Sequence, residues 1–402
     1  MSRPASLLTT GFAGVAHSFS HLFTLLYATV VLVLEREWGL SYGELIALSL
    51  PGMIMFGLGA LPAGWLGDRW SASGMIAVFY FGVGLSSIAT GLATGPLSIA
   101  IGLALIGTFA SIYHPVGIPW LVRHALNRGR ALGINGVFGS AGTAAAGIVA
   151  GALAAWLGWR AAFILPGVVS LLIGLGFLWA MRGGFIVEGG QDAAPEPAPA
   201  RADIKRTFIV LSFTMLLTGL IYQCTAFALP KLFDERLSGI GLDVAAIGGL
   251  VTLCYTVSAL SQVAGGELAD RFSLKGVYIW AQVFQIPVIA FAFTLYSPAL
   301  VGAAALMISL NLAGQPAENA LLARYTPPAW RGRAFGAKFV LALGIGSLGP
   351  VIIALLYEVT GALDVLFAAL LLFAAGTAIV ALWLPGRREA AITGTSPATA
   401  AE

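Results

Sequence analysis

The stretch GWLGDR at residues 64–69 is repeated as GELADR at residues 266–271, about 202 residues further along the chain. Agreement in a single hexapeptide would mean little, but two further pairs keep nearly the same spacing. They are RGRALG at 128–133 with RGRAFG at 331–336, and His-Pro at 114–115 with Gln-Pro at 315–316. Agreement at three places with one offset is improbable by chance. We therefore predict that the chain consists of two related halves.

The composition around these motifs is that of a membrane protein. Of the 402 residues, 58% are apolar and only 10% are charged, whereas a soluble domain is about 25% charged. This argues strongly against a soluble globular enzyme, and the high hydrophobicity argues against a disordered protein. The net charge of +3 is too small for nucleic-acid binding, so no nucleic acid is expected as a partner.

Twelve apolar stretches are each long enough to cross a bilayer as a helix, which takes about 20 residues. They lie at residues 8–34, 43–66, 74–93, 96–121, 130–156, 160–181, 207–232, 243–268, 275–295, 298–323, 333–357 and 361–384. Each half has six spans, an even number, so both halves enter the membrane from the same side. We predict an all-α polytopic membrane protein with two parallel six-helix bundles and a substrate site between them near the midplane.

Composition also sets the expected boundaries of the two halves. The N-terminal six-helix bundle covers residues 1–181 and the C-terminal bundle covers residues 207–385. Residues 182–206 contain the run AAPEPAP and are expected to form an extended cytoplasmic linker. Residues 386–402 are expected to be a disordered cytoplasmic tail.

The positive charges are sorted between the two sides of the membrane. The termini and the loops that follow spans 2, 4, 6, 8 and 10 hold 16 of the 21 Lys and Arg residues. Loops rich in Lys and Arg stay in the cytoplasm. We therefore expect an integral protein of the plasma (inner) membrane, surrounded by the lipid bilayer, with both termini cytoplasmic.

The twelve spans, the long central linker and the two Gly-x-Leu-x-Asp-Arg loops resemble the major facilitator superfamily over about residues 7–385. The resemblance implies a secondary active transporter that moves a small-molecule substrate by alternating access. It also implies that spans 1, 4, 7 and 10 line the cavity. We expect a protein that is not an enzyme, functions as a monomer and needs no cofactor, with the proton gradient as its energy source.

Within the superfamily, three features are similar to the fosmidomycin-resistance-type exporters. They are His17-x-x-x-His21 in span 1, Tyr113-His114-Pro115 in span 4, and RGRALG followed by NGVFG at 135–139. This weaker resemblance implies export.

The family resemblance also predicts a cytoplasmic gate. Asp68 and Asp270 follow spans 2 and 8, and they would clamp the gate closed through arginines. Those arginines are Arg69, Arg123, Arg128, Arg271, Arg324 and Arg331. The alternative is that these residues only cap loops and set topology.

Span 10 holds the densest cluster of polar residues. Asn311, Gln315, Glu318 and Asn319 have the i, i+4, i+7, i+8 spacing of one helix face. Polar groups in hydrocarbon are costly, so they are interpreted as lining a cavity, with Glu318 as a proton or cation site. The alternative is a structural contact that pairs Glu318 with Lys338 of span 11. Lys338 would then either offset Glu318 or attract an anionic substrate.

Histidines form a second candidate cluster. His17 and His21 are i, i+4 neighbours in span 1, and His114, next to Tyr113, is near the middle of span 4. An imidazole titrates near pH 6.5 and so suits a proton relay, but it also binds transition metals or forms structural hydrogen bonds between helices. Gln223 in span 7 is the repeat counterpart of His21, as Gln315 is of His114.

These residues favour proton-coupled export of small organic molecules, with Glu318 and one or more of His21 and His114 handling the proton. No metal site is assigned in this main interpretation. One alternative is transport of a transition-metal cation by the membrane histidines and Glu318. Another is a transporter-like membrane sensor or scaffold, although its soluble parts contain no visible signalling module. Neither a P-loop nor a metalloprotease helix motif is present, which leaves ATP-driven pumping and enzymatic hydrolysis without support.

Overall fold

The computed structural model describes residues 3–125, 128–186, 201–326, 334, 337–338 and 340–385. The first half contains α1 (Arg3–Trp38), α2 (Tyr42–Ala47), α3 (Leu50–Arg69), α4 (Ala72–Gly91), α5 (Pro96–Ala110), the π-helix η1 (Tyr113–Gly117), α6 (Ile118–His124), α7 (Arg128–Leu157) and α8 (Ala161–Arg182). The second half contains α9 (Arg201–Arg236), the 3₁₀ turn η2 (Ser238–Ile240), α10 (Val244–Arg271), α11 (Leu274–Phe293), α12 (Ala299–Ala313), α13 (Gln315–Tyr325), the π-helix η4 (Val340–Ile345), the 3₁₀ turn η5 (Gly346–Leu348), α15 (Gly349–Thr360) and α16 (Asp364–Ala381). The predicted tail, 386–402, and most of the predicted linker lie outside the described residues.

Eleven helical segments of the described chain are long and apolar enough to cross a membrane. They correspond in order to all of the predicted spans except the one at 333–357. Of that span, the described part comprises η4, η5 and the short apolar helix α15. The all-α membrane fold predicted from the sequence is therefore confirmed.

Local signals explain where several helices begin and end. Ser41 caps α2 by accepting a hydrogen bond from the backbone N–H of Glu44, whose carboxylate accepts one from the N–H of Ser41. Asp243 caps α10 in the same position. Gly241 and Gly361 have φ angles of +65° and +68° where the chain leaves η2 and α15, a conformation that costs glycine least.

Spans 4 and 10 are each interrupted near the middle, at the repeated dipeptides His-Pro (114–115) and Gln-Pro (315–316). Pro115 lies within η1, which separates α5 from α6, and Pro316 is the second residue of α13. Proline lacks a backbone N–H and its ring crowds the preceding turn, so it interrupts the helix. The predicted polar stripe of span 10 is consequently not on one continuous helix: Asn311 belongs to α12, whereas Glu318 belongs to α13.

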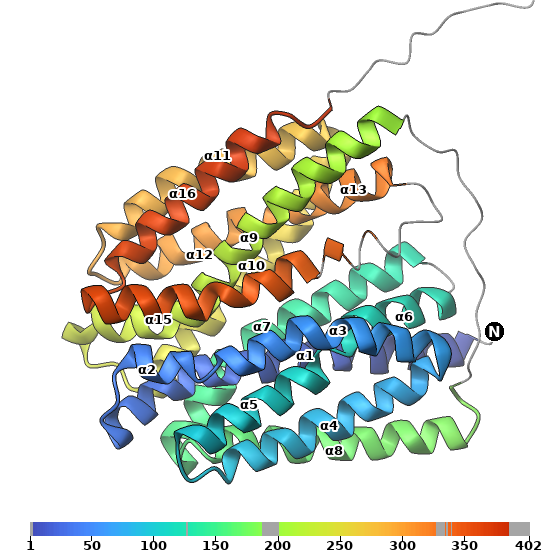
Figure 1. The fold of residues 1–402 in the computed structure, drawn as a ribbon, viewed down its shortest axis with the longest axis horizontal. Coiled ribbons are helices and arrows are strands. Elements are labelled where there is room, and N and C mark those ends of the chain that lie inside the picture. Colours follow the sequence, from blue (N-terminus) through green and yellow to red (C-terminus); the bar gives the residue numbers. More distant parts are fainter. Residues whose placement is uncertain are drawn as a thin grey trace, which may run out of the picture.

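Helices α1 to α8 form one group and α9 to α16 another, stacked side by side in Figure 1. Between the groups, α7 packs along α10, and α2 and α3 pack along η4, η5 and α15. The approach of α7 to α10 is close, because a Cβ added to Gly147 would lie 2.6 Å from the carbonyl oxygen of Gly248. Small residues permit such helix contacts in membranes.

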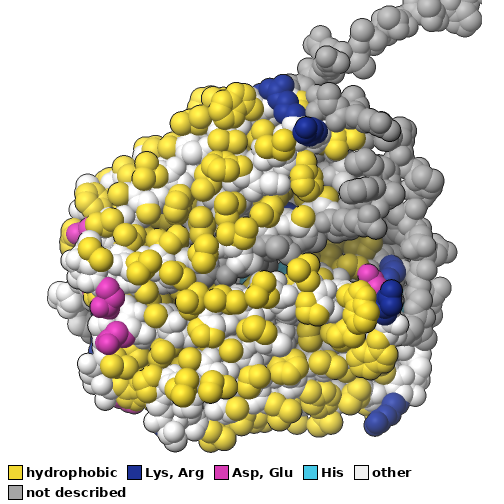
Figure 2. All heavy atoms as spheres, viewed as in Figure 1, with side chains coloured by type: hydrophobic (Ala, Val, Ile, Leu, Met, Phe, Trp, Pro, Cys, Tyr) yellow, Lys and Arg dark blue, Asp and Glu magenta, His cyan; other side chains and the backbone are white. Residues whose placement is uncertain are grey.

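Large apolar side chains cover the outside of the helices, as Figure 2 shows. Trp156 is 76% exposed, Leu97 75% and Leu372 72%. An apolar surface of this extent belongs against lipid rather than water. In the same view most acidic side chains lie at the left end, whereas Lys and Arg gather towards the right end. The chain is an integral membrane protein.

Candidate functional site

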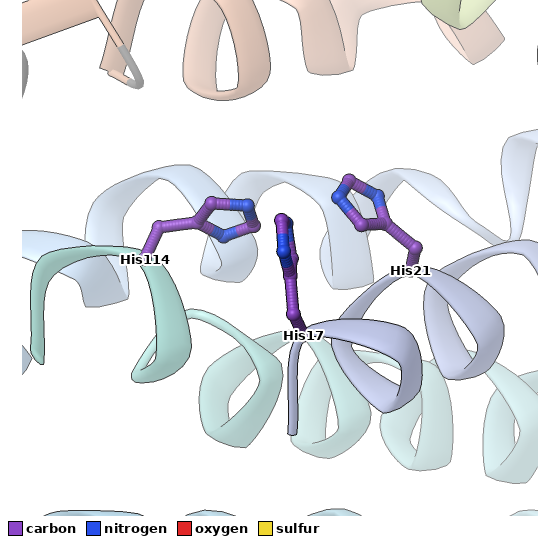
Figure 3. Close-up of side chains that lie close together, drawn as sticks. All are labelled: His17, His21 and His114. Atoms are coloured by element: carbon purple, nitrogen blue, oxygen red, sulfur yellow. The ribbon is translucent and has the colours of Figure 1, made fainter. Parts of the chain in front are cut away.

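Three histidine side chains from α1 and η1 converge in the first half (Figure 3). The ring centroids of His17, His21 and His114 form a nearly equilateral triangle with sides of 5.1, 5.2 and 5.3 Å. One nitrogen of each ring lies within 4.8 Å of the others. His114 is buried, and His17 and His21 are partly exposed. The i, i+4 spacing predicts that the first two share a face, but only the fold brings His114 to them.

Helix α7 fixes the orientation of two rings in this cluster. Nδ1 of His17 lies 2.8 Å from the backbone carbonyl oxygen of Asn135, so Nδ1 carries the proton and donates it. The hydroxyl of Tyr113 donates to Oδ1 of the same asparagine at 2.5 Å. The rings of His17 and Tyr113 stack with centroids 4.8 Å apart. In this tautomer the Nε2 of His17 keeps its lone pair and can accept a hydrogen bond or bind a metal ion.

Tight packing against α7 leaves His17 little room to move. A Cβ added to Gly139 would lie 2.5 Å from Cε1 of His17, so a residue without a side chain is required there. On the other side of the cluster, Phe56 of α3 meets His114 edge to face, with centroids 6.0 Å apart. Helices α7 and α3, from two further spans, thus pack against the histidines.

A buried ion pair joins spans 10 and 11 in the second half. Nζ of Lys338 lies 2.7 Å from Oε1 of Glu318, and the two side chains are 10% and 4% exposed. Lys338 also donates to Oδ1 of Asn319 at 2.5 Å, and the hydroxyl of Tyr278 donates to Oε2 of Glu318 at 2.9 Å. Both charges are therefore compensated by hydrogen bonds as well as by each other.

The other polar residues predicted on the second half lie elsewhere. Gln223 is buried where α9 meets η5 and α15: a Cβ added to Gly349 would lie 3.0 Å from its Cβ. Gln315 is partly buried at the start of α13. The sequence-predicted site residues therefore form separate clusters, with the histidines in one half and the Glu318–Lys338 pair in the other.

Asn311 lines a small internal pocket among α9, α10, α11 and α12, whose volume of about 10 Å³ is roughly the room that one water molecule needs. The lining residues are Ile221, Tyr222, Thr225, Tyr255, Gln285, Met307, Ile308 and Asn311. Four of their buried polar atoms have no hydrogen-bond partner among the described residues: Oγ1 of Thr225, the hydroxyl of Tyr255, Oε1 of Gln285 and Nδ2 of Asn311. Such atoms normally bind water or a ligand, because an unpaired polar group in a low-dielectric interior is costly.

The predicted cytoplasmic gate residues lie at helix ends and make few contacts among the described residues. Asp68, Arg69, Asp270, Arg271 and Arg324 are exposed, and Arg123 is partly buried. The contacts of the arginines are local: Arg69 lies over Trp65, Arg324 lies over Tyr325, and Arg271 lies 3.7 Å from Glu267. The side chain of Arg128 and the whole of Arg331 lie outside the described residues.

An ion-pair network that the sequence analysis did not identify joins the two halves at the opposite end. Lys231 of α9 is buried, and its Nζ lies 2.7 Å from Oε2 of Glu35 on α1. Asp234 and Glu235 lie 4.0 and 3.6 Å from the same nitrogen. The hydroxyl of Tyr357 donates to Glu235 at 2.6 Å. Within the described part of the chain, the ion pairs that join the halves all lie at this end.

A sequence signal for this network exists in hindsight. The tripeptides ERE at 35–37 and DER at 234–236 end the first span of each half. Charged runs at matching positions of the two halves would indicate that the ends of these two spans contact each other. The positive-inside argument counts Lys231 only as a loop charge, and it says nothing about partners.

The comparisons with known proteins agree on the family. The family model described as Major Facilitator Superfamily matches residues 12–240 and again 211–401. The 4-hydroxybenzoate transporter PcaK of Pseudomonas aeruginosa is 26% identical over 375 residues, covering 79% of this chain and 78% of the relative. The gallate transporter of Pseudomonas putida is 27% identical over 368 residues, covering 79% and 77%. These relatives are named as transporters, which confirms the expectation of a transporter rather than an enzyme.

Solved structures show the same fold. A bacterial homologue of the human lysosomal transporter Spinster, in an inward-facing and occupied conformation, superposes with a TM-score of 0.74 at 16% identity. The match covers 96% of this chain and 95% of that one. A peptide transporter POT mutant in complex with alafosfalin gives a TM-score of 0.74 at 16% identity, with coverage of 94% and 93%.

Proposed function

Because the chain belongs to the major facilitator superfamily and is a membrane transporter, we propose that it couples the movement of a small organic molecule to protons through Glu318. The observation that carries this proposal is the Glu318–Lys338 ion pair, which lies within the spans and is almost fully buried. The transporter would work by alternating access, with the proton gradient as its energy source.

The chemistry of the pair supports proton coupling. A single charge in the membrane interior is costly, but the two opposite charges offset each other as long as both are ionised. Protonation of Glu318 neutralises the carboxylate and leaves the Lys338 ammonium without its counter-ion. An anionic group of a substrate would then be the favoured partner of Lys338. Proton binding and substrate binding are thereby linked at one lysine.

Aromatic carboxylates are the substrate class that we propose to test first. Two relatives with about a quarter of their residues identical are named for 4-hydroxybenzoate and gallate, which are both aromatic carboxylates. Once Glu318 is protonated, the free ammonium of Lys338 would bind the carboxylate of such a substrate. The small-molecule substrate is the partner that these groups require.

We further propose that the described conformation opens towards the cytoplasm. The Lys231–Glu35 pair ties the halves together at the end that the positive-inside rule assigns to the outside. The gate residues Asp68 and Asp270, at the other end, are exposed. In the outward-open state the Lys231 network would be broken, and the Asp–Arg loops would close. Export, the direction predicted from sequence, stays a prediction that the same assay measures.

The test is flux in proteoliposomes loaded with a pH-sensitive dye. We expect an outward or inward gradient of 4-hydroxybenzoate to drive a proton movement that Glu318→Gln abolishes. Glu44→Gln is the matched control, because Glu44 is an exposed capping residue and glutamine preserves the capping box. Proton movement that survives Glu318→Gln would remove Glu318 from coupling. Flux without any proton movement in the unmodified protein would overturn proton coupling itself, and no flux with any small molecule would favour the sensor or scaffold alternative.

A further inference from the structure

We propose that His17, His21 and His114 form a binding site for a divalent transition-metal ion such as Zn²⁺, Co²⁺ or Ni²⁺. This inference concerns a binding site in the first half, and it stands independently of the organic substrate and of proton coupling. The notable feature is the meeting of three nitrogen ligands from two spans, with no carboxylate or thiol among them.

The ligand type selects the ion. Imidazole nitrogen suits zinc, copper, nickel and cobalt, whereas calcium and magnesium require oxygen ligands. Three histidines with an open fourth position are a known arrangement for zinc. Tetrahedral coordination at 2.0–2.1 Å places the ligand nitrogens about 3.4 Å apart. The three nitrogens lie within 4.8 Å of one another, so ring rotations that close each gap by at most about 1.4 Å would complete the site.

The surroundings fix the tautomer that a ligand needs. Metal-binding histidines usually donate their second N–H to a carbonyl or carboxylate, which orients the ring and raises its basicity. Nδ1 of His17 makes this contact with the carbonyl oxygen of Asn135 at 2.8 Å. The Tyr113 ring, stacked on His17, and the backbone at Gly139 hold the imidazole in place from both sides. The tautomer leaves the Nε2 lone pair of His17 available for a metal ion.

The fourth coordination position would be open to the space between the halves. The three rings turn towards one another on the side of α1 and η1 that faces the ribbon of the second half (Figure 3), and His17 and His21 are partly exposed. Three neutral imidazoles leave the charge of a divalent ion uncompensated. An anionic ligand such as hydroxide or a carboxylate would offset part of that charge, and hence we assign the open position to water or an anion.

The test is titration of the purified, detergent-solubilised protein, carrying an affinity tag without histidines, with Co²⁺, followed by visible absorption spectroscopy. Zn²⁺ and Ni²⁺ are titrated in parallel by calorimetry. We expect one ion per chain and the visible bands of four-coordinate Co²⁺. Replacing a residue that only hydrogen-bonds to a metal ligand typically lowers metal affinity 10- to 100-fold. Each of His17→Ala, His21→Ala and His114→Ala removes a ligand itself and should weaken Co²⁺ binding by more than that.

The chain provides its own control, because it has four histidines in total. His124 is buried in α6, where its Nδ1 lies 2.7 Å from the carbonyl oxygen of Trp120. His124→Ala should leave Co²⁺ binding unchanged. His21→Gln retains a polar side chain at a partly exposed position, and thermal unfolding of this variant shows that loss of binding is not loss of fold. The proposal is overturned if no ion binds, or if binding survives replacement of all three clustered histidines.

Discussion

The ammonium of Lys231 and the carboxylate of Glu35 lie 2.7 Å apart and join α9 to α1 across the two halves of the protein. The pair lies near the C-terminal ends of both helices, and Lys231 is only 7% exposed. Two further carboxylates, Asp234 and Glu235, surround the same ammonium. One buried lysine therefore holds together a cluster of acids from both halves.

Replacing Lys231 with Met should open this end. Removing one partner of a buried ion pair costs about 3–5 kcal/mol, and here it also leaves three carboxylates close together. Hydrogen–deuterium exchange of the last turns of α1 and α9 should rise. Arg36→Gln is the control: Arg36 bridges Asp234 at 2.8 Å but is 61% exposed, and exposed pairs contribute only about 0–1 kcal/mol. Unchanged exchange in the Lys231 variant would show that packing, not charge, closes this end.

The Glu318–Lys338 pair predicts a non-additive effect on stability. Glu318→Gln leaves the Lys338 ammonium buried without its partner, so the midpoint of thermal unfolding should fall. The double variant Glu318→Gln, Lys338→Met removes both charges and should recover much of that loss, because replacing a complete buried pair is often neutral or stabilising. Both variants should lose proton coupling. Two single losses that simply add in the double variant would show that the two charges do not interact.

The pocket around Asn311 predicts that replacing Asn311 lowers transport without lowering the stability of the protein. Nδ2 of Asn311 has no hydrogen-bond partner among the described residues, so Asn311→Leu should leave the unfolding midpoint equal or higher. Transport should nevertheless fall if this atom binds substrate or an ordered water. Gln282→Leu is the matched control, because neither amide atom of this buried residue is paired among the described residues and it does not line the pocket. Equal transport in both variants would assign Asn311 a purely structural role.

Gly139→Ala should disturb the histidine cluster without touching a histidine. The added Cβ would lie 2.5 Å from His17, so the ring must shift away from the geometry set by Asn135. We expect weaker Co²⁺ binding in titrations of this variant. Gly136→Ala, one turn earlier on the same helix, meets nothing within 4 Å and should bind Co²⁺ as the unmodified protein does. Equal binding by both variants would mean that the position of His17 does not control the site.

The sequence placed most of the fold correctly because membrane helices are determined locally. A span needs about 20 apolar residues wherever it occurs. The side of the membrane on which a loop lies is predicted from the Lys and Arg residues of that loop alone. The sequence also places His17 and His21 one helical turn apart. It did not foresee that Gln-Pro at 315–316 would end one helix and begin another, which separates Asn311 from Glu318.

The amino-acid sequence by itself therefore determined the class of protein, the order of its spans and the repeat of its two halves. These depend on composition and on contacts between near neighbours. Only the tertiary structure decided that His114 joins the α1 histidines, that Lys338 pairs with Glu318, and that Lys231 meets Glu35. Each of these contacts links residues on different helices, and it is set by how breaks, glycines and side-chain packing rotate one helix against another.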